Sequence, residues 1–404
     1  MPDPDPTVDV GLAAFARGDM ERAVSILGDA VERFQPGGAP RAELLQRLGS
    51  ALARTGQFER ADAALTESVD LASASGDEGL VLRSTIERMT WRLQSRRASQ
   101  EEAQALGESA LPLLEQLGDE LGLAKAWHLL GNEYVAASSA AGVEALERAL
   151  THARRAGDQR EIGDILWWLG VAYHFGPMPA DEAIGRCEAM LELSRMDRSV
   201  EAGTLGMLAG LNAMRGNFAE ARDLFGRSLA ILDSLGMRLR MATRRTISGG
   251  IELLADDPVA AERELRWGYQ RLEEMGQRAD LGPLAAQLCE ALYRQGRYEE
   301  AELYANDPAL AASRSLRAIR AKLAARRGDG EAAEGLAREV VSGTDRTDDI
   351  NRQGDARVAL AEVLALRGHA GEARATFEEA LARYDAKGNV AARGRVVSLM
   401  DLLA

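Results

Sequence analysis

The side chains that most often carry enzyme chemistry are few in this sequence and stand far apart. There are four histidines, which are His128, His152, His174 and His369. None of them has the spacing of a metal-binding pair such as H-E-x-x-H. Adjacent carboxylates such as Glu101-Glu102 are frequent, and at this density they are typical of solvated helix faces. Because the sequence also lacks a phosphate-binding loop and a nucleophile elbow, it predicts a protein that is not an enzyme.

The two cysteines, Cys187 and Cys289, are separated by about a hundred residues. One pair so placed offers neither a disulfide framework nor the paired spacing of a zinc site. Both lie within helical patterns, where a cysteine usually acts as a small buried hydrophobic residue. We therefore expect no metal and no cofactor.

The net charge of −14 argues against partners that need a basic surface. Nucleic acids and anionic membranes are both bound through clusters of Lys and Arg. The first residues, 1–7, are rich in Pro and Asp and do not form a signal peptide. The longest apolar stretch, 165–175, is too short to span a bilayer. We expect a cytoplasmic protein that binds neither nucleic acid nor membrane.

An internal repeat organises the whole chain of 404 residues. A turn residue, often Gly, is followed five positions later by an Ala, and this pattern recurs about every 39 residues. The alanines of the series are Ala23, Ala61, Ala103, Ala145, Ala183, Ala221, Ala261, Ala301, Ala333 and Ala373. The residue eight positions after each of them is apolar, so both lie on one face of a helix. Ten helix hairpins are predicted, with Pro308 ending the second helix of the eighth hairpin early.

The first helices of these units carry a recognisable motif. Residues 127–134 read Trp-His-Leu-Leu-Gly-Asn-Glu-Tyr and match the W-x2-L-G-x2-Y signature. Residues 166–173 and 45–52 are close variants. The chain therefore resembles the tetratricopeptide repeat family over essentially its full length. Units longer than 34 residues, and Trp91 at a position that normally holds a small residue, depart from the family pattern.

The resemblance implies an all-α fold, a right-handed superhelical solenoid of about ten tetratricopeptide-like helix hairpins. We expect residues 1–7 to be a disordered tail and residues 8–404 to form one continuous solenoid. The segment 384–389 with its following short helix resembles the last repeat in the helical regions of large bacterial signalling proteins, which join an ATPase to a cyclase or to a LuxR-type DNA-binding domain.

In this family the first helices line the concave surface, where peptide ligands lie. Carried over by position, that surface would hold Arg88, Arg92, Lys125, His128, Asn132, Trp167 and His174. A set of Lys, Asn and Arg side chains in such a groove is similar to the carboxylate-binding clamp of chaperone-tail readers. The competing interpretation is an ordinary polar groove whose cations pair with carboxylates such as Asp164. We expect the clamp-like donors to suit an acidic segment or a C-terminal carboxylate.

Three functions remain open from the sequence. The first is a protein- or peptide-binding scaffold that uses the concave face. The second is a regulatory module that senses a peptide or a small ligand in a bacterial signalling system. The third is an enzyme with an unrecognised site. A homo-oligomer is compatible with each of the three.

Overall fold

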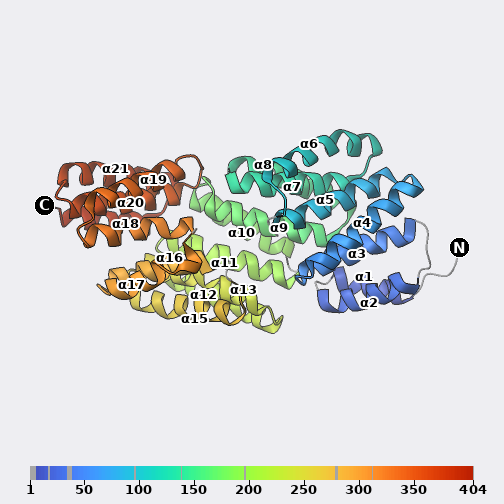
Figure 1. The fold of residues 1–404 in the computed structure, drawn as a ribbon, viewed down its shortest axis with the longest axis horizontal. Coiled ribbons are helices and arrows are strands. Elements are labelled where there is room, and N and C mark those ends of the chain that lie inside the picture. Colours follow the sequence, from blue (N-terminus) through green and yellow to red (C-terminus); the bar gives the residue numbers. More distant parts are fainter. Residues whose placement is uncertain are drawn as a thin grey trace. The chain divides into compact units, whose positions relative to one another are not determined.

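The computed structural model describes residues 6–16, 19–33, 39–94, 97–137, 139–194, 197–277, 281–311 and 313–403. Within these ranges the chain is almost entirely helical and forms no strand (Figure 1). The predicted all-α class is therefore confirmed.

The helices fall into two compact units, each described here by itself. Unit 1 comprises residues 1–136 and 141–169, and unit 2 comprises residues 137–140 and 170–404, so that the boundary lies within α9. The part of the chain up to the unit boundary contains α1 (Pro6–Ala16), α2 (Met20–Arg33), α3 (Ala39–Arg54), α4 (Phe58–Ser75), α5 (Glu78–Gln94), α6 (Gln100–Leu117), α7 (Glu120–Ala137), α8 (Ser139–Ala156) and the beginning of α9 (Gln159–Phe175).

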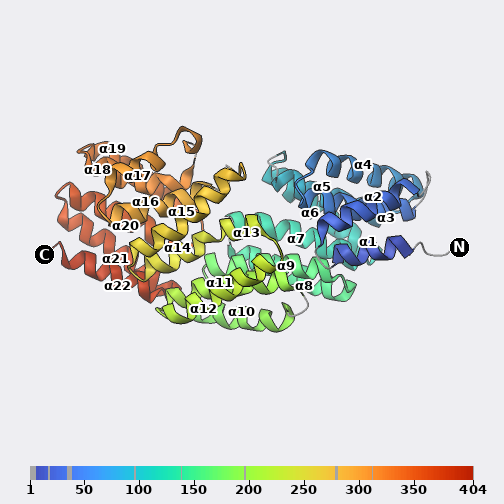
Figure 2. The same cartoon turned by 90° about the horizontal axis from the view of Figure 1, so that it is seen from below.

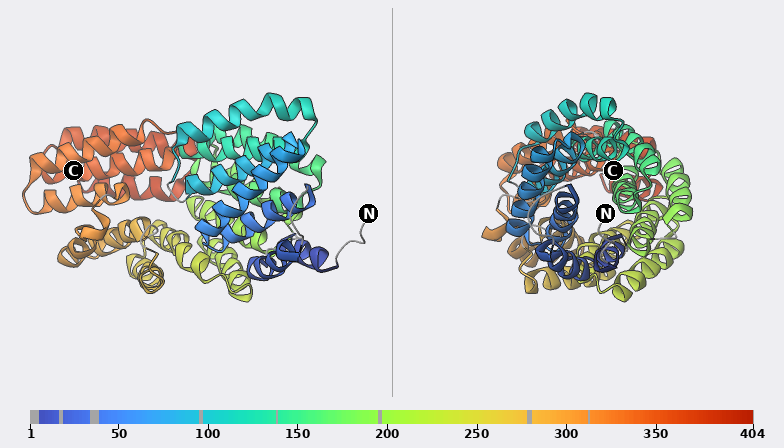
Figure 3. Two further views of the ribbon diagram at one scale, coloured as in Figure 1. Left: turned by 45° about the vertical axis from the view of Figure 1, so that its right-hand side comes forward. Right: turned by 90° about the vertical axis from the view of Figure 1, so that its right-hand side faces the viewer.

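Unit 2 continues from the end of α9 to the last helix. Its helices are α10 (Ala180–Ser194), α11 (Arg198–Met214), α12 (Phe218–Ser234), α13 (Arg238–Thr243), α14 (Arg245–Leu254), α15 (Pro258–Glu274), α16 (Leu281–Arg294), α17 (Tyr298–Ala305), α18 (Arg317–Arg326), α19 (Gly330–Thr344), α20 (Ile350–Leu366), α21 (Ala370–Lys387) and α22 (Val390–Asp401). Figure 2 shows α20, α21 and α22 packed side by side, and the left view of Figure 3 shows the C-terminal helices, in orange and red, as a row.

Consecutive helices pair as hairpins, with the repeating Ala at the contact between them. Each of the ten alanines of the series has an exposed fraction between 0% and 2%. A small side chain at this position lets the two helices approach closely. Gly131 of the signature motif acts in the same way, because a Cβ there would lie 2.7 Å from Cγ of Leu146 on the second helix. The predicted helix hairpins are thus confirmed.

The loops that lengthen the units use a Gly-Asp pair to end one helix and begin the next. Gly118 adopts a left-handed φ of 64° at the end of α6, a conformation that Gly accepts without strain. Asp119 then accepts a hydrogen bond of 2.9 Å from the backbone N–H of Gly122. The pairs at 76–77 and 157–158 repeat this arrangement. The turn therefore stops the second helix and caps the following first helix.

Two units depart from a regular hairpin. The first helix of the seventh unit is divided at Arg244 into α13 and α14, and the Gly249-Gly250 pair lies within α14. As predicted, the second helix of the eighth unit is short, because α17 ends at Ala305 and Pro308 begins a 3-10 turn. At the N-terminus, residues 1–5 of the expected tail lie outside the described residues, and α1 already begins at Pro6.

Candidate functional site

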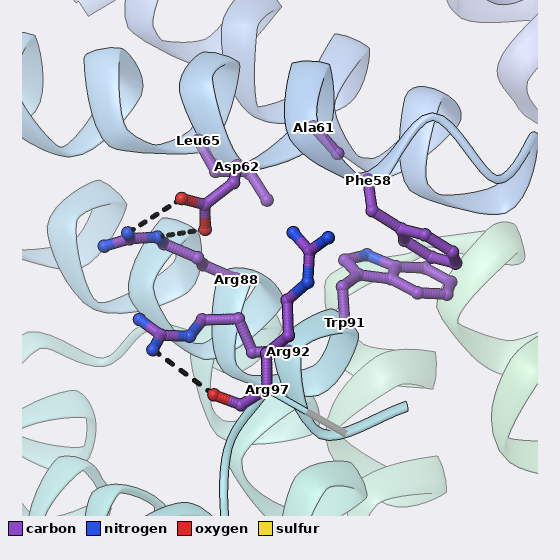
Figure 4. Close-up of a pocket in the computed structure, with 8 residues that line it drawn as sticks. All are labelled: Phe58, Ala61, Asp62, Leu65, Arg88, Trp91, Arg92 and Arg97. Atoms are coloured by element: carbon purple, nitrogen blue, oxygen red, sulfur yellow. Dashed lines mark hydrogen bonds and ion pairs between the residues drawn. The ribbon is translucent and has the colours of Figure 1, made fainter. Parts of the chain in front are cut away.

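A pocket of about 230 Å³ lies in unit 1 between α4, α5 and the segment that follows α5. It combines an apolar floor with several guanidinium groups (Figure 4). Its lining residues are Phe58, Ala61, Asp62, Leu65, Arg88, Trp91, Arg92 and Arg97. Two of the residues expected to bind a ligand, Arg88 and Arg92, thus lie in one pocket.

Arg88 is held by a carboxylate of the neighbouring helix. Its Nε and Nη2 donate to the two oxygens of Asp62 at 2.7 and 3.0 Å, which is a bidentate pair. The hydrogen bond from Arg88 is the main reason why the pKa of Asp62 is lowered. This pair joins α5 to α4 and fixes one wall of the pocket (Figure 4).

Arg92 and Arg97 lie beside each other below α4 in Figure 4. Arg92 Nη2 donates to the backbone oxygen of Arg97 at 3.4 Å. Arg97 pairs with Glu59 at 2.5 Å, but the two side chains are 49% and 78% exposed. An ion pair in such contact with solvent contributes little to stability, so Arg97 can exchange Glu59 for another anion at small cost.

Trp91 connects this pocket to the interior of unit 1. Its ring lines the pocket next to Phe58, and its Nε1 donates to Oε1 of Glu87 at 3.1 Å. The guanidinium carbon of Arg54 lies 5.4 Å from the centre of the ring, which is within the range of a cation–π contact. Trp91 also packs against the core formed by α1 to α4.

A buried network of charges begins at Glu87 and runs through the first helices of four hairpins. Its members are Ser50 and Arg54 of α3, Glu87 of α5, Lys125 and His128 of α7, and Arg160, Glu161 and Asp164 of α9, and we call it the Lys125 network. Neighbouring charges of opposite sign alternate along it. Because all four first helices contribute, the network ties them together within unit 1.

Lys125 lies at the centre of this network, with only 11% of its side chain exposed. Its Nζ donates to Glu87 and, at 2.9 Å, to Glu161. Burial alone would lower the pKa of Lys125, but Glu161 and Glu87 outweigh it and raise that pKa. For the same reason the pKa of Glu161 is lowered despite its burial. Both partners are therefore charged at neutral pH.

His128 and Asp164 extend the network at either side. His128 Nδ1 lies 2.5 Å from Oε1 of Glu161. Asp164 pairs with Arg160 and with Arg54, whose Nη1 donates at 3.1 Å. Burial would raise the pKa of Asp164, but these two guanidinium groups lower it. Lys125 and His128, the two residues of α7 that were expected to bind a ligand, thus contact carboxylates of their own chain.

The remaining expected residues have separate environments. Asn132 is half-buried on α7, and its Oδ1 has no hydrogen-bond partner among the described residues. Trp167 is half-buried on α9. His174 lies in unit 2, where it is 8% exposed and packs against Gly210. Burial, together with the charge of Lys387, lowers the pKa of His174 to about 3, so this histidine is neutral.

The contacts therefore divide the single groove that was expected. Arg88 and Arg92 line the pocket at α4, Lys125 and His128 belong to the buried network, and His174 belongs to the other unit. The pocket residues Phe58 and Arg97 and the network carboxylates Glu87 and Glu161 were not predicted from the sequence, whereas Asp164 was named there as a partner for the cations. The one signal for them was Trp91, whose size departs from the repeat pattern.

Neither a metal site nor a reactive thiol is found in the part of the chain that the structure describes. No group of three or more His, Cys, Asp or Glu side chains there could hold a metal ion. Both cysteines are buried, and burial raises the pKa of each thiol to about 12. None of the helices that the structure describes is both long enough and apolar enough to cross a membrane.

Comparison with known families and structures supports the architecture. A family model described as tetratricopeptide repeat matches residues 42–75, which correspond to the hairpin of α3 and α4. No curated protein matches the chain in sequence. A solved structure of a Rap protein complexed with competence and sporulation factor is 12% identical, with a TM-score of 0.56, over 91% of this chain and 98% of that chain. This level of likeness reports a shared fold.

Two further solved structures have lower TM-scores. Yeast Tom70 is 12% identical with a TM-score of 0.44, over 98% of this chain and 88% of that chain. The apo form of the quorum sensor NprR from B. thuringiensis is 13% identical with a TM-score of 0.44, over 94% and 97% of the two chains.

Proposed function

We propose that this chain, an all-helical repeat protein whose residues 42–75 match the tetratricopeptide repeat, binds a protein or peptide segment rather than catalysing a reaction. The observation that carries the proposal is the pocket between α4 and α5, which brings three guanidinium groups and two aromatic rings to one surface site. Such a combination suits an acidic segment that also carries apolar groups. The bound factor named for the Rap structure is consistent with this use of the fold.

The pocket, rather than the Lys125 network, is the proposed point of contact in unit 1. Arg92 and Arg97 stand at its partly exposed rim, whereas Lys125 and His128 each contact Glu161 within the fold. Pulling Lys125 away from its carboxylates would leave buried charges unpaired, which costs several kcal/mol. The network therefore supports the helices. A cytoplasmic location and an acidic partner complete the proposal.

Regulation by a bound segment is the second candidate, and Trp91 is the observation that favours it. This one side chain both lines the pocket and donates to Glu87 of the Lys125 network. A ligand that shifts the Trp91 ring would disturb its hydrogen bond to Glu87, which also contacts Ser50 of α3 and Lys125 of α7. Binding at the pocket would then change how α5 and α7 pack against each other through Glu87 and Lys125.

Selection from a displayed library of random peptides tests the proposed function. Peptides enriched on the full chain should contain acidic residues and bind in isothermal titration calorimetry. Arg92→Gln should weaken them about tenfold, because a charge-assisted hydrogen bond is lost. Arg155→Gln is the matched control, since Arg155 is 60% exposed on α8 of the same unit. A library that yields no binding peptide, or binders indifferent to Arg92, would contradict the proposal.

A further inference from the structure

We propose that the contact between α3 and α9 is a latch that closes the inner face of unit 1, and that its ion pairs break to open that face. The inner face is the surface of α3, α5, α7 and α9 that carries the Lys125 network. The latch consists of Arg47 and Arg54 on α3, of Asp158, which directly precedes α9, and of Asp164 within α9. This inference goes beyond the proposed function, because it concerns the chain without any ligand.

The first argument is that the latch closes a cycle of contacts. Within the Lys125 network, hydrogen bonds and ion pairs join α3 to α5, α5 to α7, and α7 to α9, in the order of the repeats. The latch is a fourth link that returns from α9 directly to α3. Arg47 Nη1 donates to Asp158 at 3.1 Å, and Arg54 Nη1 donates to Asp164 at 3.1 Å. The four first helices therefore enclose their own polar side chains.

The second argument is that charged groups make this link. The buried apolar residues of α3 all belong to two hydrophobic clusters, and the described members of both clusters come from α1 to α5 and not from α9. Separating apolar surfaces exposes them to water, which is unfavourable in proportion to their area. Charged groups that separate regain their hydration. Opening the latch is therefore easier than opening a hairpin.

The third argument is that both sides of the latch keep other contacts when it opens. On the α9 side, Asp158 accepts from Arg47 through Oδ2 and from the backbone N–H of Glu161 through Oδ1, at 3.0 Å. It therefore still caps α9 after Arg47 has moved away. Asp164 stays paired with Arg160, one turn away on the same helix.

The α3 side is provided for in the same way. The guanidinium carbon of Arg54 lies 5.4 Å from the ring centre of Trp91. That of Arg47 lies 5.7 Å from the ring centre of Phe15 on α1. Both distances are within the range of a cation–π contact. The latch thus differs from Lys125, whose separation from its carboxylates would leave buried charges unpaired.

The fourth argument is that the closed inner face carries buried polar atoms that lack a hydrogen-bond partner among the described residues. They are Gln46 Nε2, Arg54 Nε, His128 Nε2 and Asn132 Oδ1. Gln46 and Arg54 lie two turns apart on one face of α3, and His128 and Asn132 lie one turn apart on one face of α7. Buried polar groups without partners are unfavourable. Opening gives these atoms access to water, so the latch holds the inner face closed against a penalty that opening relieves.

The test measures the distance across the latch in the full chain. Glu43→Cys on α3 and Gln159→Cys on α9 place spin labels at two exposed positions beside the latch. Cys187 and Cys289 are 0% exposed, so the labels attach to the introduced thiols of the native chain. Double electron–electron resonance should give one short distance in dilute buffer. The latch side chains are 13–28% exposed, so salt at about 1 M should weaken their pairs and add a longer distance.

Two variants of α3 separate the latch from ordinary ion pairs. Arg47→Gln should raise the ratio of open to closed chains about tenfold, because one charge-assisted hydrogen bond of the latch is lost. Arg41→Gln is the matched control, since Arg41 pairs with Glu67 of α4 at 2.7 Å within its own hairpin. It should leave the distances as they are. Circular dichroism would show that each variant folds, and the salt series decides the question if Arg47→Gln does not fold.

A second readout follows the pocket between α4 and α5. Opening takes Arg54 away from Asp164 while its guanidinium group still faces the Trp91 ring, which lines that pocket. The indole N–H resonance of Trp91, assigned with a Trp91→Phe variant, should therefore shift in Arg47→Gln and not in Arg41→Gln.

The short distance alone, both at high salt and in Arg47→Gln, would overturn the latch and mark the contact as static. A long distance already in dilute buffer would also overturn it, because the pairs would then not close. Equal lengthening in Arg41→Gln would assign the effect to a general loosening of unit 1. A changed distance with a constant Trp91 resonance would refute the link to the pocket. None of these measurements uses a peptide, so they test the latch separately from the proposed function.

Discussion

Lys125 and Lys322 occupy equivalent places in the two units, each between a carboxylate of the preceding first helix and one of the following first helix. In unit 2, Lys322 is 3% exposed and lies 2.9 Å from Glu290 and 3.0 Å from Glu362. Burial would lower the pKa of Lys322, but these carboxylates raise it, as the carboxylates around Lys125 do there. In each unit a buried ammonium group thus joins three consecutive first helices.

Replacing Lys125 with Met should strongly destabilise unit 1. The change removes a positive charge but leaves Glu87 and Glu161 buried without it, and breaking a buried pair in this way costs about 3–5 kcal/mol. Urea denaturation followed by circular dichroism would measure the loss. A second variant that also carries Glu87→Gln and Glu161→Gln should recover part of the stability. An unchanged midpoint for Lys125→Met alone would show that the network does not stabilise the fold.

The stability of unit 2 should fall in acid because of His174. Its pKa is about 3 in the folded chain against an ordinary value of 6.5. Between these values the unfolded chain binds a proton that the folded chain does not, so the free energy of unfolding decreases as pH falls from 6.5 towards 3. The slope reaches about 1.4 kcal/mol per pH unit for one proton. His174→Gln should remove this slope, measured by urea denaturation over the acid range.

The matched control for this prediction is His369→Gln. The His369 side chain is 42% exposed, so its replacement should leave the acid dependence as it is in the unchanged chain. A His174→Gln variant with the full acid slope would mean that other groups cause it.

Ala221 tests the helix contact that defines the repeat. It is 0% exposed at the start of α12, in the hairpin of α11 and α12 that turns at Gly216. Ala221→Leu should overpack this contact and destabilise the chain by about 1–3 kcal/mol. Urea denaturation would measure the change, with the neighbouring exposed position Glu220→Leu as the control. Equal midpoints for Ala221→Leu and the unchanged chain would refute the close packing.

Lys387 should hold the end of α9 in unit 2. Its Nζ is fully buried and donates to the backbone oxygens of Tyr173, Gly176 and Met178 at 3.2, 2.6 and 2.8 Å. Lys387→Met would leave these oxygens without their donor, at a cost of about 1–3 kcal/mol. Faster amide hydrogen exchange in residues 170–180 should accompany the loss. Unchanged exchange there would indicate that water replaces the ammonium group without effect.

Sequence periodicity was a sufficient guide to the hairpins because local packing sets them. The repeating Ala, the turn Gly and the apolar residue on the same helix face all act within one or two neighbouring helices. The same local reasoning located the early end of α17 at Pro308. It gave no sign that the first helix of the seventh unit is divided at Arg244.

The residues of the candidate site could be predicted only in part from the sequence, because their positions depend on contacts between different repeats. Positional offsets selected Lys125 and His128 for the inner face, but they do not reveal that Glu87 and Glu161 reach the same side chains from other hairpins. The contact of Lys387 with Tyr173 joins residues 214 positions apart. No periodic pattern encodes a contact of that kind. The departure of Trp91 from the repeat was the one local sign of the pocket.

The burial of Lys125, Lys322 and Lys387 has a practical consequence, because these are the three lysines of the chain. Every ε-amino group is engaged inside the fold, so amine-directed cross-linkers, dyes and acetylating reagents should react slowly with these lysines in the native molecule. Unfolding would expose three further amines. Mass spectrometry after brief acylation would therefore count unfolded molecules directly, and enzymatic lysine modification of this chain would require it to open first.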